Sequence, residues 1–163
     1  MKFASRLRLL PALLLLTTGL FTTACKKEAE AKPDNEIIQD YLTSNNITTA
    51  QKQPSGLYYV PVLANPAGVR AVATNTVSVL YTGRLMDGTV FDASANNGNV
   101  PISFVLGTGR VIKGWDEGIA LMRKGEKAQL LIPSALAYGS RGAGSSIPPN
   151  AVLRFDVELT DVR

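Results

Sequence analysis

The chain of 163 residues is 45% hydrophobic and 18% charged, which suits one compact domain with a short extension. One cysteine and no histidine exclude an intramolecular disulfide, histidine-based catalysis and most zinc or transition-metal sites, and no cofactor is expected. The net charge is +4, but Lys2, Arg6 and Arg8 precede the first acid; removing these three from 17 basic residues leaves 14 against 13 acidic ones. The charge therefore does not predict nucleic-acid binding.

Residues 1–24 have the pattern of a secretion signal peptide, with a basic start, an apolar run and small residues before Cys25. The tail "FTTAC" resembles the bacterial lipobox, in which the cysteine is lipidated and becomes the new N-terminus. Thr22 departs from the usual leucine, so ordinary signal cleavage with Cys25 as an incidental thiol is the alternative. We expect lipidation at Cys25, and Lys26 after it favours anchorage in the outer membrane of the cell envelope, facing the periplasm.

Two short segments follow the cysteine. Residues 25–34 are small and charged, with nothing to bury, and predict a flexible tether. Residues 35–54 begin with apolar side chains at helical spacing, which predict a short helix with Asn35 or Asp34 as its N-cap, then a linker. So short a helix needs docking to be stable.

The middle of the chain predicts strands. "SGLYYVPVL" is β-rich, and Pro61 within it favours an edge position. "NTVSVLYTGRLMDGTVFDAS" contains two alternating runs joined through Asp87-Gly88, a pair that favours a tight hairpin turn. In order, the pattern predicts a strand at 55–63, a hairpin at 75–94, a loop at 95–101 and a strand at 102–106.

A change of spacing from Gly114 predicts a helix of about three turns, with Trp115, Ile119 and Met122 on one face. Strands follow at 127–133 and 151–163, separated by a loop rich in glycine, serine and proline that suggests a functional role. The second strand alternates apolar and polar side chains. The expected fold is α+β: an antiparallel sheet of about five to six strands, half covered by one short helix.

The stretch "GRVIKGWDEG" could be read as a phosphate-binding loop, but Ile112 stands where the dinucleotide motif needs a third glycine. Asp116 and Glu117 are adjacent and cannot share a helix face as an acid–base pair. Asp92 follows Phe91 at a strand end among aromatic residues, and from spacing alone it reads as a turn or capping aspartate. Local chemistry alone therefore leaves the function open.

Longer motifs carry more information. "VLYTGRLMDGTVFDAS", "FVLGTGRVIKGWDEGIALMRKGEKAQLLIP" and "AYGSRGAGSSIPPNAVLRFDVEL" resemble, in order, the FKBP-type peptidyl-prolyl cis-trans isomerases. With the preceding β-rich run, the resemblance covers residues 55–163. It implies an antiparallel sheet wrapped around one short helix, and catalysis of X-Pro isomerisation. Together with the signal-peptide pattern, this predicts a role in the folding of exported proteins. Its substrates would be proline-containing segments, and macrolides its inhibitors.

The resemblance also implies a pocket. Trp115 would lie beneath the proline ring, the Ile112 N–H and the Tyr138 hydroxyl would bind substrate carbonyls, and Tyr81 would hold Asp92 at the wall. The implied catalytic residues are Tyr81, Asp92, Trp115, Tyr138 and Phe155, and the substrate-binding residues are Phe91, Phe104, Val111, Ile112 and Ile147.

Two departures from the family lie near the rim: Ala143 replaces a larger side chain, and Ser146 replaces an apolar one. We expect activity to survive them and substrate preference to shift. A long N-terminal dimerisation arm is not evident, which favours a monomer. A non-catalytic proline-binding or chaperone module is the alternative function, and a structural lipoprotein with a purely packed core is a weaker one.

Overall fold

The computed structural model describes residues 32–163, which belong to one compact unit. The predicted signal peptide, the lipidation site Cys25 and most of the predicted tether lie outside the described residues. Within residues 32–163, neither α-helix is long and apolar enough to cross a membrane.

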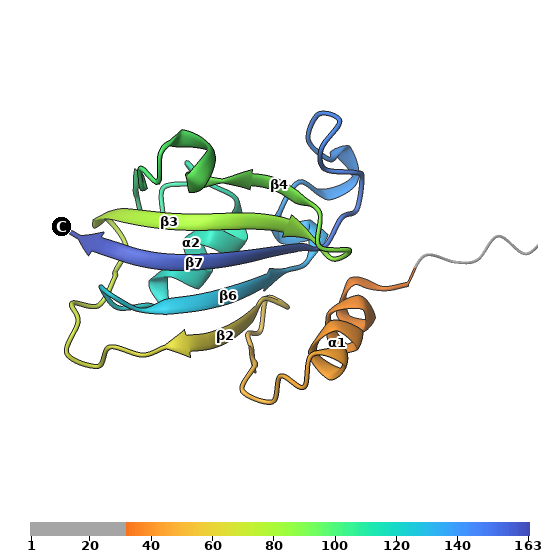
Figure 1. Ribbon diagram of the computed structural model, residues 1–163, viewed down its shortest axis with the longest axis horizontal. Coiled ribbons are helices and arrows are strands. Elements are labelled where there is room, and N and C mark those ends of the chain that lie inside the picture. Colours follow the sequence, from red (N-terminus) through yellow and green to blue (C-terminus); the bar gives the residue numbers. More distant parts are fainter. Residues whose placement is uncertain (1–31) are drawn as a thin grey trace, which may run out of the picture. The chain divides into compact units, whose positions relative to one another are not determined.

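A single antiparallel sheet organises this unit (Figure 1). The strand order is β1-β2-β6-β7-β3-β4, and β5 pairs with β3. The predicted fold class is confirmed, with seven strands rather than five to six, because the two residues of β1 carry no apolar pattern. The strands are β1 (Gln51–Lys52), β2 (Tyr58–Leu63), β3 (Thr76–Leu85), β4 (Val90–Ala93), β5 (Ile102–Val105), β6 (Lys127–Ile132) and β7 (Leu153–Val162).

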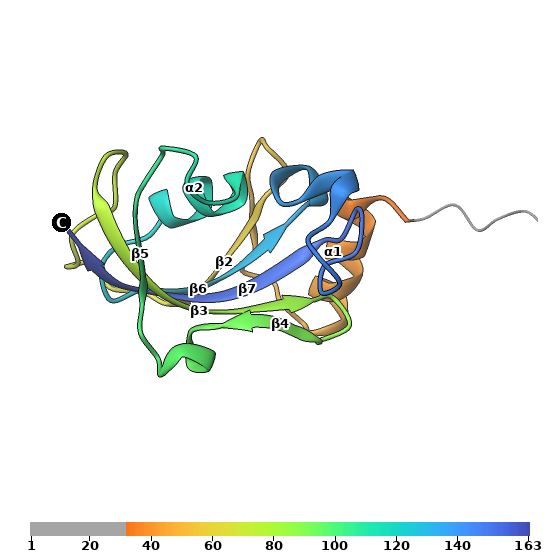
Figure 2. The ribbon, with the colours of Figure 1, turned by 90° about the horizontal axis from the view of Figure 1, so that it is seen from above.

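Helix α2 (Lys113–Ala120) lies against one face of the sheet (Figure 2). Gly114 and Gly118 permit the close approach: a Cβ at Gly114 would lie 2.5 Å from Ile132, and one at Gly118 would lie 2.7 Å from Leu130. The helix has eight residues, shorter than the three turns predicted, and Met122 is buried beyond its end. Alternating apolar side chains of the central strands complete this main core. The strand residues in it include Leu130, Ile132, Leu153, Phe155, Val157 and Leu159.

Helix α1 (Asp34–Ser44) packs on side chains of β2 and β6 that point away from the main core. Its buried residues Ile38 and Leu42 form a second cluster with Tyr58, Val60, Leu131 and Val152. Pro33 occupies the N-cap position, not Asn35 or Asp34, and the Asp34 carboxylate instead accepts hydrogen bonds from Ser134. The predicted short helix is thus docked on the sheet.

The predicted hairpin is formed by β3 and β4. Its turn is closed by the Gly88 N–H donating to the Leu85 carbonyl at 3.0 Å, and Gly88 has a φ of 94° that favours glycine. The strands pair Gly83 with Asp92 and then Arg84 with Val90, which leaves Phe91 as the extra residue of a β-bulge.

The longer connections contain short 3₁₀ turns. The predicted loop after the hairpin includes η1 (Ser94–Asn97), because Gly98 in the left-handed region ends a turn there. The connection between β6 and β7 includes η2 (Ser134–Leu136) and η3 (Gly139–Arg141), and Tyr138 lies between them. The predicted strand at 55–63 begins only at Tyr58, because Gly56 has a φ of 96° in the preceding turn.

Candidate functional site

An apolar cavity of about 200 Å³ lies beside α2 and opens to solvent. Strands β3, β4, β5 and β7 contribute to it, together with the segment before α2 and the loop between η2 and η3. The lining residues are Tyr81, Phe91, Asp92, Ile102, Arg110, Val111, Ile112, Trp115, Tyr138 and Phe155. All the predicted catalytic and substrate-binding residues except Phe104 and Ile147 are therefore brought together here.

Trp115 forms the centre of the aromatic lining. Its ring meets Tyr81 edge-on at 5.1 Å between centroids and Phe155 edge-on at 5.3 Å. Such edge-to-face pairs add to the stabilisation from burial itself. The Trp115 side chain is 4% exposed, and its indole N–H has no hydrogen-bond partner among the described residues. A buried N–H without an acceptor is destabilising, which makes this position unusual for a residue that serves packing alone.

Tyr81 and Asp92 form the polar pair of the lining. The Tyr81 hydroxyl donates to Asp92 Oδ2 at 2.6 Å, and the Ala93 N–H donates to Asp92 Oδ1 at 2.8 Å. Burial, then the hydrogen bond and negative charge of Asp92, raise the pKa of Tyr81 to about 12. Tyr81 consequently remains a protonated donor at alkaline pH values where an ordinary tyrosine ionises, and its hydroxyl holds the Asp92 carboxylate against the cavity wall.

Two further donors line the cavity. The Ile112 N–H has no acceptor within residues 32–163, because Ile112 is the N-cap residue that precedes α2. Tyr138 is 40% exposed and stands at the cavity mouth, between two short 3₁₀ turns. An apolar cavity with a few polar groups at its edge can bind a small apolar ring and orient the peptide on either side of it.

The segment that carries Ile112 is fixed by a residue with an unexpected role. Asp116 Oδ1 accepts the Gly107 N–H at 2.8 Å, and its Oδ2 accepts the Gly109 N–H at 3.0 Å. Both glycines have positive φ, 77° and 69°. The sequence suggested only that Asp116 favours a helix N-terminus. The structure shows that Asp116 also ties the preceding loop to the first turn of α2.

Gly83 determines how closely two walls of the cavity approach. A Cβ at Gly83 would lie 2.6 Å from Phe91 and 2.8 Å from Phe155, whose rings meet edge-on at 5.4 Å. The bulge at Phe91 adds to this arrangement by turning that residue out of the regular ladder. Sequence patterns did not reveal Gly83, since the close approach depends on the strand register.

Two predicted residues lie elsewhere. Phe104 is buried behind the cavity, with its ring 5.9 Å from that of Trp115. Ile147 is also buried, and its backbone exchanges two hydrogen bonds with Ala143. Conversely, Ile102 and Arg110 line the cavity although the sequence did not single them out. Ile102 precedes Phe104 by two residues, so both lie on the same face of β5, and the more exposed Ile102 is the one that lines the cavity.

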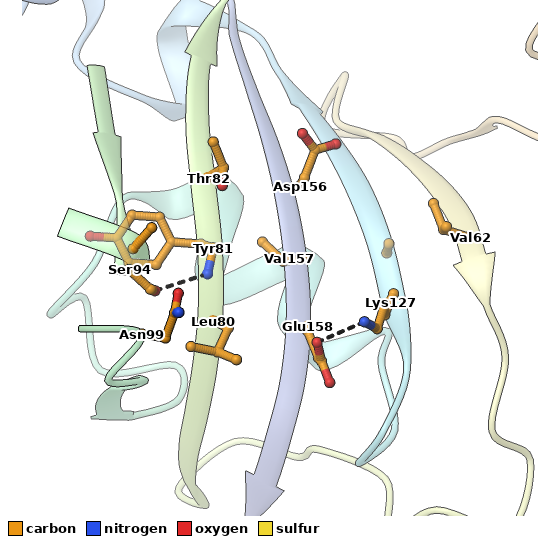
Figure 3. A pocket seen from close by; sticks show the side chains of 12 residues that line it. Val62, Leu80, Tyr81, Thr82, Ser94, Asn99, Lys127, Asp156, Val157 and Glu158 are labelled. Carbon is orange, nitrogen blue, oxygen red and sulfur yellow. Dashed lines mark hydrogen bonds and ion pairs between the residues drawn. The ribbon is translucent and has the colours of Figure 1, made fainter. Parts of the chain in front are cut away.

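A second hollow, of about 280 Å³, lies across β3, β7 and β6 on the opposite face of the sheet (Figure 3). Several of its polar groups are already paired: Lys127 forms an ion pair with Glu158 at 2.9 Å, and the Tyr81 N–H donates to Ser94 Oγ at 3.0 Å. Tyr81 is the one aromatic residue among those that line this hollow, and Phe91, Trp115 and Phe155 do not line it. We therefore place the candidate site in the aromatic cavity.

Comparison with known proteins agrees with this choice. Residues 68–160 match the model of the family described as FKBP-type peptidyl-prolyl cis-trans isomerase. The chain is 47% identical over 107 residues to "FK506-binding protein" of Neisseria meningitidis serogroup C, covering 66% of this chain and 97% of that one. It is 57% identical over 96 residues to a peptidyl-prolyl cis-trans isomerase of Saccharomyces cerevisiae, covering 58% of this chain and 70% of that protein.

Among solved structures, the crystal structure of FkpA from Escherichia coli is similar, with a TM-score of 0.69 and 41% identity. The match covers 80% of this chain and 60% of that one, so a substantial part of FkpA lies outside the match. The family match extends over more than half of the chain and includes every residue that lines the aromatic cavity. The chain therefore belongs to the FKBP-type peptidyl-prolyl cis-trans isomerase family.

Proposed function

We propose that this chain isomerises X-Pro bonds in exported proteins as they fold in the bacterial cell envelope, using the cavity floored by Trp115. The observation that carries the proposal is the combination, in one cavity, of an aromatic lining with the Tyr81–Asp92 pair and a free Ile112 N–H. The catalytic residues would be Tyr81, Asp92, Trp115, Tyr138 and Phe155, with Phe91, Val111 and Ile112 contacting the substrate. Phe104 and Ile147 would support these from behind.

The chemistry requires no nucleophile. Rotation about an X-Pro amide breaks no covalent bond, but its twisted state lies about 18–20 kcal/mol above the planar one. Conjugation is lost at the twist, so the carbonyl there is less polar than in the planar amide. A cavity that excludes water and binds the proline ring therefore favours the twisted state relative to the planar one. The Ile112 N–H and Tyr138 hydroxyl would hold the flanking carbonyls while the bond rotates.

Such catalysis would matter for export. Uncatalysed X-Pro isomerisation takes tens to hundreds of seconds, which is slow enough to limit folding. The signal-peptide pattern and the lipobox-like "FTTAC" support a location in the envelope, with the lipid on Cys25 anchoring the chain to the outer membrane and the domain facing the periplasm. The names of relatives as FK506-binding proteins support macrolides as inhibitors. We also propose a monomer, since α1 packs on its own domain.

A proline-binding or chaperone module without catalysis is the alternative function. The deciding experiment is a protease-coupled isomerisation assay on the purified chain, with Asp92→Val and Phe155→Tyr as variants. Loss of a hydrogen-bonded carboxylate from the wall should lower kcat/KM by about tenfold or more. Asp156→Asn is the matched control, because Asp156 lies on the opposite face, where it accepts a hydrogen bond from Gln129 at 2.8 Å.

The same samples test binding separately. Trp115 is the only tryptophan, so its fluorescence should change when a proline peptide or a macrolide fills the cavity. If the peptide changes this fluorescence but the wild-type chain accelerates isomerisation no more than Asp92→Val, the protein is a binding module. A tryptophan signal that saturating ligand leaves unchanged would place the binding site elsewhere.

A further inference from the structure

A second cavity adjoins the proposed proline site and extends it along the rim. It has a volume of about 610 Å³ and lies between the segment before α2 and the loop around η3. Val111, Ile112 and Tyr138 line both cavities, so they form the shared wall. A peptide bound through its proline would therefore have the adjoining cavity beside the Ile112 N–H and the Tyr138 hydroxyl, the groups proposed to hold its carbonyls.

The charged side chains around the two cavities are mainly cationic. Arg110 lines the proline cavity, and Lys113 and Arg141 line the adjoining one; all three are exposed. Within residues 32–163 none of the three forms an ion pair. Asp92 is the one acid lining either cavity in this part of the chain, and its carboxylate already accepts the Tyr81 hydroxyl. The nearby Asp116 is likewise engaged by two backbone N–H groups.

Lys113 is placed where it does not help the fold. It is the first residue of α2, at the positive end of the helix dipole, where an acidic side chain would be stabilising and a cation is not. In the hollow on the opposite face, by contrast, the cation Lys127 is neutralised by Glu158 at 2.9 Å. The rim thus keeps three cations that no described acid neutralises, next to a site for an extended peptide.

We infer that these cations select substrates, so that the proline site prefers proline segments flanked by aspartate or glutamate. This inference rests on the proposed isomerase function and specifies its substrate class. Each cation would contact a carboxylate on the peptide beside the proline. Arg110 would do so from the proline cavity, and Lys113 and Arg141 from the adjoining cavity. Because the three side chains are exposed, salt screens their effect.

The test compares matched proline peptides that carry glutamate, glutamine or lysine before the proline, and a second set varied after it, using the full chain. An exposed ion pair shifts an equilibrium by about two- to fivefold. We therefore expect kcat/KM for glutamate peptides to exceed that for lysine peptides by about tenfold at low salt, and the ratio to approach one at high salt. The triple variant Arg110→Gln, Lys113→Gln, Arg141→Gln should abolish the preference while still isomerising the glutamine peptide.

Arg70→Gln is the matched control. Arg70 is exposed and pairs through its backbone with Arg123, beyond the C-terminal end of α2, and it lines neither cavity. Its loss should leave the glutamate preference unchanged.

Equal rates for glutamate and lysine peptides, or a preference that persists in the triple variant, would overturn the inference while leaving the isomerase intact. If anionic vesicles bind the wild type but not the triple variant and peptide charge has no effect, the cations face a membrane and the inference is wrong. No acceleration with any peptide would instead defeat the proposed function.

Discussion

Gly83 is the residue at which the shape of the pocket depends on a missing side chain. Replacing Gly83 with alanine would place a Cβ 2.6 Å from Phe91 and 2.8 Å from Phe155, so at least one ring must move. Overpacking of this kind lowers the free energy of unfolding by about 1–3 kcal/mol. Because Phe91 and Phe155 are proposed walls, we expect Gly83→Ala also to lower kcat/KM by about tenfold, measured by the coupled assay.

Gly88→Ala is the control for Gly83→Ala, because it introduces backbone strain in the same hairpin without crowding the rings of Phe91 and Phe155. Gly88 lies in the turn of the same hairpin with a φ of 94°, and a Cβ there would meet nothing within 4 Å. Its substitution should lower the free energy of unfolding by about 1 kcal/mol through backbone strain, with little change in kcat/KM. Equal activity losses in both variants would show that hairpin stability, and not the approach of Phe91 to Phe155, governs the activity.

Tyr81 should give the folded protein a distinct response to alkaline pH. Its pKa is raised from 10.0 to about 12 in the folded chain, so folding favours the protonated phenol. The resulting stabilisation is complete below pH 10 and is lost as the pH rises from there towards 12. The free energy of unfolding of wild type should therefore fall more steeply over this range than that of Tyr81→Phe.

Urea unfolding at a series of alkaline pH values measures this difference. The raised pKa of Tyr59 has the same effect in both proteins and cancels from the comparison. Since burial is the largest cause of the Tyr81 shift, Asp92→Asn should reduce the extra slope without removing it. A constant stability difference between wild type and Tyr81→Phe across the range would contradict the raised pKa.

At the scale of elements, local patterns predicted most of the fold. Alternation identified the hairpin and β7, and Asp87-Gly88 located the turn, because these signals lie within a few adjacent residues. The end of α2 at Ala120 was not predicted, since Met122 continues the apolar spacing although it is buried from a non-helical segment. Strand β1 was missed for the opposite reason: it has two exposed residues and is defined only by pairing with β2.

The site was predictable to a similar degree. The family resemblance supplied most of its lining, but the resemblance could not distinguish the buried Phe104, whose ring lies against Trp115, from the more exposed Ile102 on the same face of β5. Gly83 and the bulge at Phe91 depend on pairing between strands, and so they are properties of register. The role of Asp116 depends on a loop whose glycines adopt positive φ, which spacing alone does not indicate.

Helix α1 is joined to the loop of the proposed site by one carboxylate. Asp34 Oδ2 accepts both the N–H and the hydroxyl of Ser134, at 2.8 and 2.7 Å, and Ser134 begins η2, which leads to Tyr138. We expect Asp34→Ala to lower the free energy of unfolding by about 2–3 kcal/mol, because two donors lose a charged acceptor. The freed loop should also raise KM for proline peptides more than it changes kcat.

Glu36→Ala is the control for this effect. Glu36 belongs to the same first turn of α1, and within residues 32–163 its carboxylate forms one ion pair, with Lys32 at 3.6 Å, in which both side chains are largely exposed. It should change stability by less than about 1 kcal/mol and leave KM unchanged. Asp34→Asn retains one side-chain acceptor and should partly restore KM. An Asp34→Ala chain whose KM is normal at a temperature where it is folded would show that α1 does not position the loop.

At the scale of the whole domain, the sheet is the element that connects the two hydrophobic clusters. Along β6, Leu130 and Ile132 belong to the main core, whereas Leu131 between them belongs to the cluster under α1. Along β2, Tyr59 faces the main core and its neighbours Tyr58 and Val60 face α1. Neither cluster can lose its packing without exposing strands that the other cluster needs, which predicts that both unfold together.

Ile38→Ala tests this coupling. Ile38 is fully buried in the α1 cluster, so its truncation should lower the free energy of unfolding by about 2–5 kcal/mol. Trp115 lies in the other cluster and reports on the pocket side of the sheet. If the domain is one cooperative unit, urea unfolding followed by Trp115 fluorescence and by circular dichroism should shift to the same lower midpoint. Ile37→Ala should lower the urea midpoint less, because the neighbouring Ile37 is only partly buried. A Trp115 transition that stays at the wild-type midpoint in Ile38→Ala would mean that α1 opens alone, and α1 would then be a separable appendage of the isomerase domain.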